Sequence, residues 1–138
     1  MPQLDCYLFF DGNCAEAMRF YQRTLGGELT MMTNAESPAA AHTPPADANR
    51  IMHARLSLDG QTLMASDWMT GRPYEGKKGF SLAVAYPTVT EAKRVFEALG
   101  QGGQITMPFD KTFWAEGFGM LVDRFGTHWM VNGNLAQM

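Results

Sequence analysis

Two similar phrases in the sequence decide the fold, Leu-Gly-Gly-Glu-Leu-Thr-Met at residues 25–31 and Gly-Gly-Gln-Ile-Thr-Met at residues 102–107. In each phrase a pair of glycines ends a segment of helical spacing, and a segment typical of a strand follows. Gly26-Gly27 and Gly102-Gly103 therefore mark equivalent points of an internal repeat of about 76 residues. The repeat predicts a chain made of two modules with the same plan.

The first half of the chain predicts the order β-α-β-β-β. Its helix follows the Asp11-Gly12 turn, with Asn13 as the predicted N-cap and apolar side chains at helical spacing from Cys14 to Leu25. A hairpin is predicted around Asp59-Gly60. The predicted strands cover residues 4–10, 28–32, 50–58 and 61–66.

The second half repeats this plan. Thr88 and Glu91 form a capping pattern at the start of a helix. The helix has an apolar face made of Ala92, Val95, Phe96 and Leu99, and it ends in the glycines at residues 100–103. The predicted strands cover residues 80–85, 104–107, 119–123 and 127–132.

These patterns predict a single α+β domain over residues 1–138 made of two βαβββ modules. We expect module one at about 1–67, a linker at about 68–79 and module two at about 80–138. Residues 33–49 are rich in Ala, Pro and polar side chains and are longer than most connections, so they predict a lid or a flexible loop.

Composition limits the class of protein. The chain has 138 residues, of which 46% are hydrophobic and 18% charged, which is enough to build one core. A net charge of −3 with scattered basic residues argues against nucleic acid as a partner. No apolar run is long enough to span a membrane and no leader pattern opens the chain, so we expect a cytoplasmic protein without a membrane partner.

The sulfur-containing residues predict packing rather than chemistry. Cys6 and Cys14 are too few for a disulfide scaffold and have no CxxC spacing, so we expect both to stay reduced. The chain has 11 methionines, a residue type that fills irregular space in cores. We therefore expect most of the methionines to lie in the core.

Four segments carry a family resemblance: Tyr-Leu-Phe-Phe-Asp-Gly-Asn-Cys (7–14), Met-His-Ala-Arg-Leu (52–56), Leu-Met-Ala-Ser-Asp (63–67) and Asp-Arg-Phe-Gly-Thr-His-Trp-Met-Val-Asn (123–132). Together they resemble the PhnB-like family over nearly the whole chain. The resemblance implies the vicinal-oxygen-chelate fold of glyoxalase I, bleomycin-resistance proteins and dihydroxybiphenyl dioxygenases. In that fold two βαβββ modules form curved half-barrels around a cleft.

The resemblance also allows a test for a metal site. Enzymes of this superfamily hold a metal with four ligands, usually His, Glu or Gln, on the first and last strands of the two modules. The matching positions here, each uncertain by one residue, are Cys6, Met64, Ser81 and Met130. Two thioethers, a hydroxyl and a thiol do not suit a hard or borderline divalent ion. We therefore predict no metal site and no cofactor.

Proteins of this branch often carry the name demethylubiquinone methyltransferase. The chain shows no strand followed by a glycine-rich turn and a helix that would hold a nucleotide-like cofactor. The sequence therefore does not support that activity.

The remaining candidates for ligand binding are polar or aromatic. His53 lies in an apolar strand, and alternation predicts that it shares a face with Ile51 and Arg55. His53 and Asp67 could act as an acid–base couple if the hairpin register allowed contact; the alternatives are a satisfied histidine and a turn aspartate. Trp68, Trp114 and Asn132 could line a cleft, or they could be core and turn residues.

Two hypotheses about function follow. The first is metal-independent binding of a small molecule in an aromatic-lined cleft covered by residues 33–49, with a symmetric homodimer as the assembly. The second is a metal-dependent enzyme of the glyoxalase, dioxygenase or resistance-transferase type with relocated ligands such as His53 and Asp67. An interaction or structural protein is a third possibility.

Overall fold

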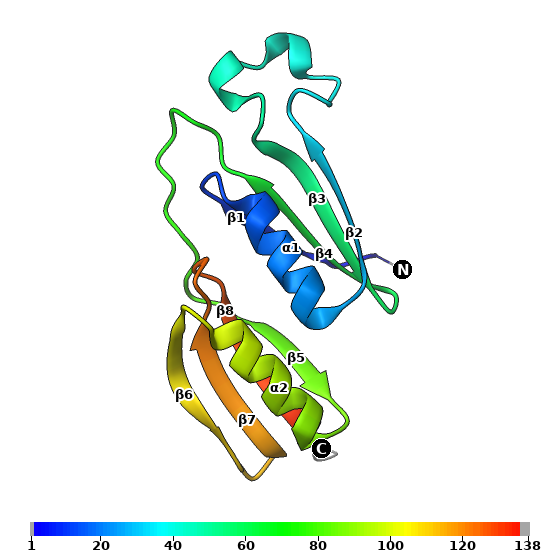
Figure 1. The fold of residues 1–138 in the computed structure, drawn as a ribbon, viewed down its shortest axis with the longest axis vertical. Coiled ribbons are helices and arrows are strands. Elements are labelled where there is room, and N and C mark those ends of the chain that lie inside the picture. The colour runs from blue at the N-terminus through cyan, green and yellow to red at the C-terminus, as the bar shows by residue number, and fades with distance from the viewer. Residues whose placement is uncertain (1, 136–138) are drawn as a thin grey trace. The chain divides into compact units, whose positions relative to one another are not determined.

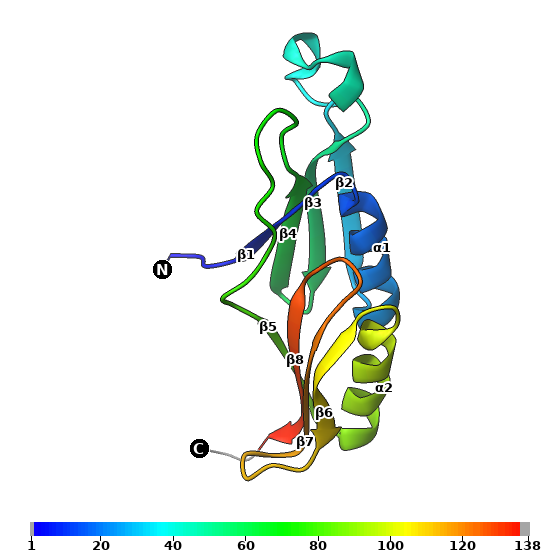
Figure 2. The same ribbon diagram turned by 90° about the vertical axis from the view of Figure 1, so that its left-hand side faces the viewer.

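The computed structural model describes residues 2–135 and divides the chain into two compact units, Met1–Gly76 and Lys77–Met138. Each unit is one βαβββ module with a four-stranded sheet that does not close on itself (Figures 1 and 2). The predicted α+β class and the internal repeat are therefore confirmed. Within the described residues, neither helix has the length and apolar character needed to span a membrane.

The first unit places one helix against one face of its sheet. The sheet has the order β1-β4-β3-β2, in which β1 is parallel to β4 and the other neighbours are antiparallel. The elements are β1 (Cys6–Phe10), α1 (Cys14–Leu25), β2 (Glu28–Thr33), the 3-10 turns η1 (Ala40–His42) and η2 (Pro45–Asp47), β3 (Ile51–Leu58) and β4 (Gln61–Asp67).

The second unit repeats this topology strand for strand. Its sheet has the order β5-β8-β7-β6, with β5 parallel to β8. Figure 1 shows α2 over one face of this sheet, as α1 lies over the first. The elements are β5 (Leu82–Tyr86), α2 (Val89–Gly100), β6 (Gln104–Asp110), β7 (Ala115–Val122) and β8 (His128–Leu135).

The cores lie between each helix and its sheet. In the first unit Leu8, Phe10, Met18, Tyr21 and Leu56 are fully buried. In the second unit the predicted face of α2 is confirmed, with Ala92, Val95, Phe96 and Leu99 all buried. Each large apolar side chain buried in this way stabilises the fold by about 1.5–3 kcal/mol.

The repeated glycine pairs have a steric reason. A Cβ added to Gly27 would lie 2.3 Å from the carbonyl oxygen of Ser57, and one added to Gly103 would lie 2.3 Å from that of Val122. These distances are far inside van der Waals contact, so only glycine lets the chain pass this close to β3 or β7. The same close approach at the end of both helices explains why the two phrases look alike.

Helix capping was predicted correctly for one helix and wrongly for the other. The Thr88 hydroxyl accepts a hydrogen bond from the Glu91 amide, as predicted. Asn13 makes no side-chain capping bond. The first amide of α1, that of Cys14, instead donates to the Asp67 carboxylate at 2.9 Å, from the end of β4. A tertiary contact has replaced the local cap.

Three further expectations need correction. β6 continues to Asp110, past Pro108, because an edge strand with register shifts tolerates a proline. Residues 33–49 are more ordered than a flexible loop, since Asn34 and Ala35 extend the backbone pairing beyond β2 and two 3-10 turns follow. Among the described methionines only Met18 is fully buried, and four have exposed side chains, Met32, Met52, Met69 and Met107.

Candidate functional site

An aromatic ridge runs along the face of the first sheet that α1 does not cover. Tyr7 and Phe9 alternate along β1 with the buried Leu8 and Phe10, so their rings point away from the helix. The ring centroids of Tyr7 and Phe9 are 5.2 Å apart. Phe9 in turn meets Trp68 edge to face at 5.1 Å. The three rings form one continuous apolar surface.

A cavity of about 550 Å³ lies at one end of this ridge. That volume is within the range of small-molecule sites. Its walls come from the ridge, from the ends of β3 and β4 and from residues 34–47, and they mix apolar and polar side chains, among them Phe9, Met52, Trp68, His42, Asp47 and Thr70. The segment predicted to be a lid thus supplies part of the cavity wall.

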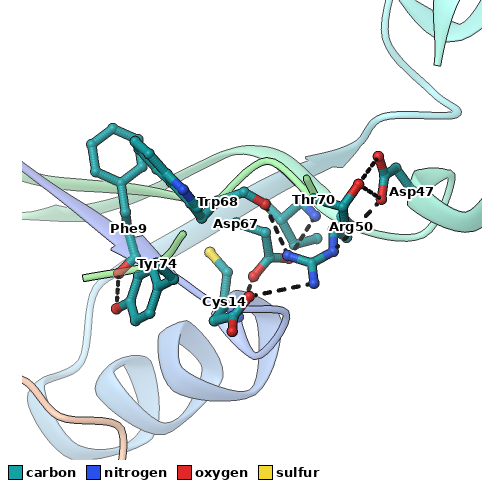
Figure 3. A network of polar contacts seen from close by, with 10 residues as sticks. Phe9, Cys14, Asp47, Arg50, Asp67, Trp68, Thr70 and Tyr74 are labelled. Atoms are coloured by element: carbon teal, nitrogen blue, oxygen red, sulfur yellow. Dashed lines mark hydrogen bonds and ion pairs between the residues drawn. The ribbon is translucent and has the colours of Figure 1, made fainter. Parts of the chain in front are cut away.

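A second cavity of about 450 Å³ is lined by Phe9 and Trp68 together with residues 72–76. Phe9 and Trp68 line both cavities and so form the wall that the two cavities share. The Tyr74 hydroxyl donates to the carbonyl oxygen of Phe9 at 2.6 Å, and Figure 3 shows these three residues together. Burial, with a smaller effect of the Asp11 charge, raises the pKa of Tyr74, so this phenol stays a donor at neutral pH.

A polar network fixes the backbone of this wall (Figure 3). The Arg50 guanidinium donates to the Trp68 carbonyl oxygen at 2.8 Å, and it lies 3.5 Å from the Asp11 carboxylate and 3.9 Å from that of Asp47. The Thr70 hydroxyl donates to Asp47 at 2.7 Å. Residues 68–76, predicted to belong to a linker, are therefore tied to the first unit and to the segment before β3.

Each carboxylate oxygen of Asp67 accepts a hydrogen bond from a backbone amide. Oδ1 accepts from the Cys14 amide at 2.9 Å, and Oδ2 accepts from the Ile51 amide at 2.8 Å. The side chain thereby joins the end of β4 to the first turn of α1 and to the start of β3, as Figure 3 shows for Cys14. Asp67 lines the larger cavity, but both of its oxygens already accept backbone hydrogen bonds.

His53 lies beside Tyr7 rather than beside Asp67. Its Nδ1 is 3.1 Å from the Tyr7 hydroxyl oxygen, and the two ring centroids are 5.7 Å apart. The prediction that His53 shares a face with Ile51 is wrong, because the pairing of β2 with β3 shifts at Met32 and Thr33. Ile51 is buried like Ala54, whereas His53 is half-buried.

Trp114 and Asn132 form a pair in the second unit. The Trp114 indole N–H donates to the Asn132 amide oxygen at 3.3 Å, and the Trp114 ring meets Phe118 edge to face at 5.0 Å. Asn132 is buried within β8, which continues to Leu135 instead of ending there. Trp114 and Asn132, which the sequence singled out separately, are thus in contact although they lie 18 positions apart.

Strand register shows which residues lie at or beside the four positions that the resemblance implies for metal ligands. Tyr7 pairs with Met64 in the first sheet, and Ala83 pairs with Met130 in the second. Cys6 lies on the α1 face with Leu8 and so does not share the open face with Tyr7, and burial raises the pKa of its thiol. Ser81 precedes β5. A phenol, two thioethers and a methyl group do not fit a divalent ion.

No group of three or more His, Cys, Asp or Glu side chains that could hold a metal ion occurs between residues 2 and 135. The relocated His53–Asp67 site has no direct contact to support it, since each side chain has the other partners described above. The site residues that sequence reasoning missed are Tyr7, Phe9, Arg50 and Tyr74. The signal for Tyr7 and Phe9 was the apolar run of residues 7–10, because alternation along a strand had to send the rings of Tyr7 and Phe9 to the face opposite Leu8 and Phe10.

Comparison with known proteins places the chain in a family. The family described as 3-demethylubiquinone-9 3-methyltransferase matches residues 2–132. Protein YjdN of Escherichia coli strain K12 is 39% identical over 144 residues, which cover 96% of this chain and 95% of YjdN. The structure of PA1353 from Pseudomonas aeruginosa is 46% identical with a TM-score of 0.89, covering 96% of this chain and 97% of PA1353.

A PhnB protein from Bacillus cereus is 27% identical, with a TM-score of 0.78 over 95% of this chain and 98% of that one. At the level of the fold, a glyoxylase/bleomycin-resistance/dioxygenase domain from Frankia is similar with a TM-score of 0.64 at 14% identity, over 96% of this chain and 98% of that domain. The chain therefore belongs to the PhnB-like 3-demethylubiquinone-9 3-methyltransferase family, and its fold is that of the glyoxalase/bleomycin-resistance superfamily.

Proposed function

We propose that the protein binds a small, largely apolar organic molecule at the Phe9–Trp68 wall of its first unit, without a divalent metal ion. The observation that carries this proposal is the wall itself, because two cavities of about 550 Å³ and 450 Å³ open on the same pair of rings. Aromatic walls with a few polar groups around them are typical of ligand sites.

Hydrogen bonds hold the backbone of the Phe9–Trp68 wall in place. The Trp68 amide donates to the Phe10 carbonyl oxygen at 2.6 Å, and the Trp68 carbonyl accepts from Arg50. Tyr74 holds the backbone of Phe9 in the same way. A binding surface whose backbone is already ordered loses less conformational entropy when a ligand arrives, and this favours binding.

Methyl transfer, which the family description names, gains no support from the chain. A nucleotide-like cofactor commonly places its phosphate or carboxylate at a helix N-terminus that follows a strand. At α1 that place is taken by the Asp67 carboxylate, which already accepts the Cys14 amide. At α2 the Thr88 hydroxyl caps the helix.

The relocated-ligand enzyme is also the weaker candidate. Asp67 would have to give up a backbone hydrogen bond to bind a metal ion, and His53 would have to leave Tyr7.

We further propose that the protein works as a homodimer in the cytoplasm. The chain has only two cysteines, Cys6 and Cys14, which are too few for a disulfide scaffold, and this suits a reducing compartment.

The test is a thermal-shift screen of small aromatic ketones, amides and esters, followed by calorimetry on the best compound. Phe9→Ala should weaken its binding at least tenfold, because about 100 Å² or more of apolar contact would be lost at about 25 cal/mol per Å². Phe113→Ala is the matched control, since Phe113 is 88% exposed and lies in the second unit. Equal affinity in the two variants, or no binding by any compound, would refute the proposal.

A further inference from the structure

The three tryptophans of the chain differ in what their indole N–H groups meet. Trp129 donates to the Asp123 carboxylate at 2.8 Å, and Trp114 donates to the Asn132 amide oxygen at 3.3 Å. The Trp68 N–H is buried, and no acceptor for it occurs within the described residues. The Trp68 ring also lines both cavities of the first unit.

A buried donor without an acceptor destabilises the state that contains it, and native proteins keep few such groups. Phe9, which meets Trp68 edge to face, can offer at most a weak contact from its π face. The backbone of Trp68 does not share the problem, because its amide and carbonyl both have partners. The missing partner is therefore specific to the indole N–H.

We propose that the missing acceptor belongs to the ligand, and that Trp68 selects molecules that carry an uncharged oxygen acceptor next to a flat apolar group. This inference rests on the proposed function of the cavities. Because the nitrogen is buried in the structure described, the ring must turn for the N–H to meet the ligand. The fixed backbone of Trp68 confines this motion to the side chain.

The charges around the cavities favour a ligand whose acceptor oxygen is uncharged. The guanidinium of Arg50 is already placed against the carboxylates of Asp11 and Asp47. Asp47 and Asp67 add negative charge to the lining of the larger cavity, and Arg72 is offset by Glu75 in the smaller one. A carboxylate or phosphate ligand would find no uncompensated cation there, whereas a ketone, ester or amide oxygen needs only the N–H.

The experiment compares two probes of the same shape, 2-acetylnaphthalene and 2-isopropenylnaphthalene, which differ in a carbonyl oxygen replaced by a methylene group. Calorimetry on the wild-type chain should show about five- to tenfold tighter binding of the ketone, the usual effect of one hydrogen bond in a site shielded from water. In Trp68→Phe the order should reverse, because the ketone then loses its hydration without gaining a donor.

A second measurement uses the wild-type protein alone. With nitrogen-15 in the tryptophans, the indole N–H resonance of Trp68 should move downfield with the ketone and much less with the alkene. The resonances of Trp114 and Trp129, which already have partners, should stay in place and serve as internal controls. Trp68→Phe identifies the resonance; if that variant fails to fold, Trp114→Phe and Trp129→Phe identify the other two resonances and leave that of Trp68 by elimination.

The possible results separate the two proposals. If both probes bind with equal affinity and Trp68→Phe changes neither, the cavities bind ligands but the N–H is satisfied by water, and the inference is wrong. If neither probe nor any compound of the thermal-shift screen binds, the proposed function fails and the inference falls with it. A ketone preference that survives in Trp68→Phe would assign the acceptor contact to another donor and would also overturn the inference.

Discussion

Removing the Asp67 carboxylate should destabilise the first unit more than any other single change of a surface-accessible charge. The two oxygens of Asp67 accept from the Cys14 and Ile51 amides, and so join β4 to the start of α1 and to the start of β3. In Asp67→Ala both amides lose their acceptor at once. In Asp67→Asn one oxygen remains, and the new NH₂ group faces the other amide.

The magnitude follows from the two contacts. Loss of a side-chain acceptor at a helix N-terminus costs about 0.5–2 kcal/mol. A second amide left without a partner costs about 1–3 kcal/mol when fully buried. Both contacts are part-buried, so water can reach the amides in part and the lower half of each range applies. We expect a loss of about 2–3 kcal/mol for Asp67→Ala and about half of that for Asp67→Asn.

Urea unfolding at pH 7, followed by circular dichroism, measures these changes against a total stability of about 5–15 kcal/mol. Asp110→Ala is the matched control, because Asp110 is exposed and its carboxylate accepts, within the part of the chain that the structure describes, from the next amide alone, that of Lys111. It should change stability by about 0.5 kcal/mol or less. Asp67→Ala within 0.5 kcal/mol of Asp110→Ala would show that the carboxylate does not hold the three elements together.

Four further results are expected. Protein purified without an affinity tag should hold no stoichiometric nickel, zinc, iron or manganese; elemental analysis that finds about one ion per chain, lost in His53→Ala or Asp67→Ala, would contradict the donor-set argument. Light scattering should give a homodimer mass, and the mass of a single chain would count against it. Thr88→Ala should cost about 1 kcal/mol in thermal or urea unfolding and Thr88→Ser should restore most of it. Asn13→Ala should have little effect, because Asn13 makes no capping bond.

Local patterns predicted the elements well where burial followed a simple period. The face of α2 and the ends of α1 were correct because helical spacing and the flanking glycines are properties of neighbouring residues. β6 was predicted too short because Pro108 argues against a strand in general but not at an edge. The face of His53 was wrong because one unpaired residue in β3 changes the alternation.

The candidate site was predicted in part. Trp68 lies in the wall shared by the two cavities, and Asp67 lies beside it. Arg50 and Tyr74 were not identified, because their roles depend on contacts with the Trp68 and Phe9 carbonyl oxygens 18 and 65 positions away. The methionines were predicted to be in the core, yet Met52 and Met69 line the larger cavity. Composition does not say which face of a sheet a residue occupies.

The sequence by itself determined the two βαβββ modules, because glycine pairs and hydrophobic period act within a few positions and repeat in the second half. The expectation that the metal-ligand positions carry no carboxylate or imidazole rests on the resemblance and on residue types, and it stays a prediction. Only the tertiary structure decided that Asp67 caps a helix 53 positions away and that the Trp68 indole N–H has no acceptor among residues 2–135. Hydrogen bonds between distant segments depend on strand register and on the packing of helix against sheet, and neither is encoded in a local pattern.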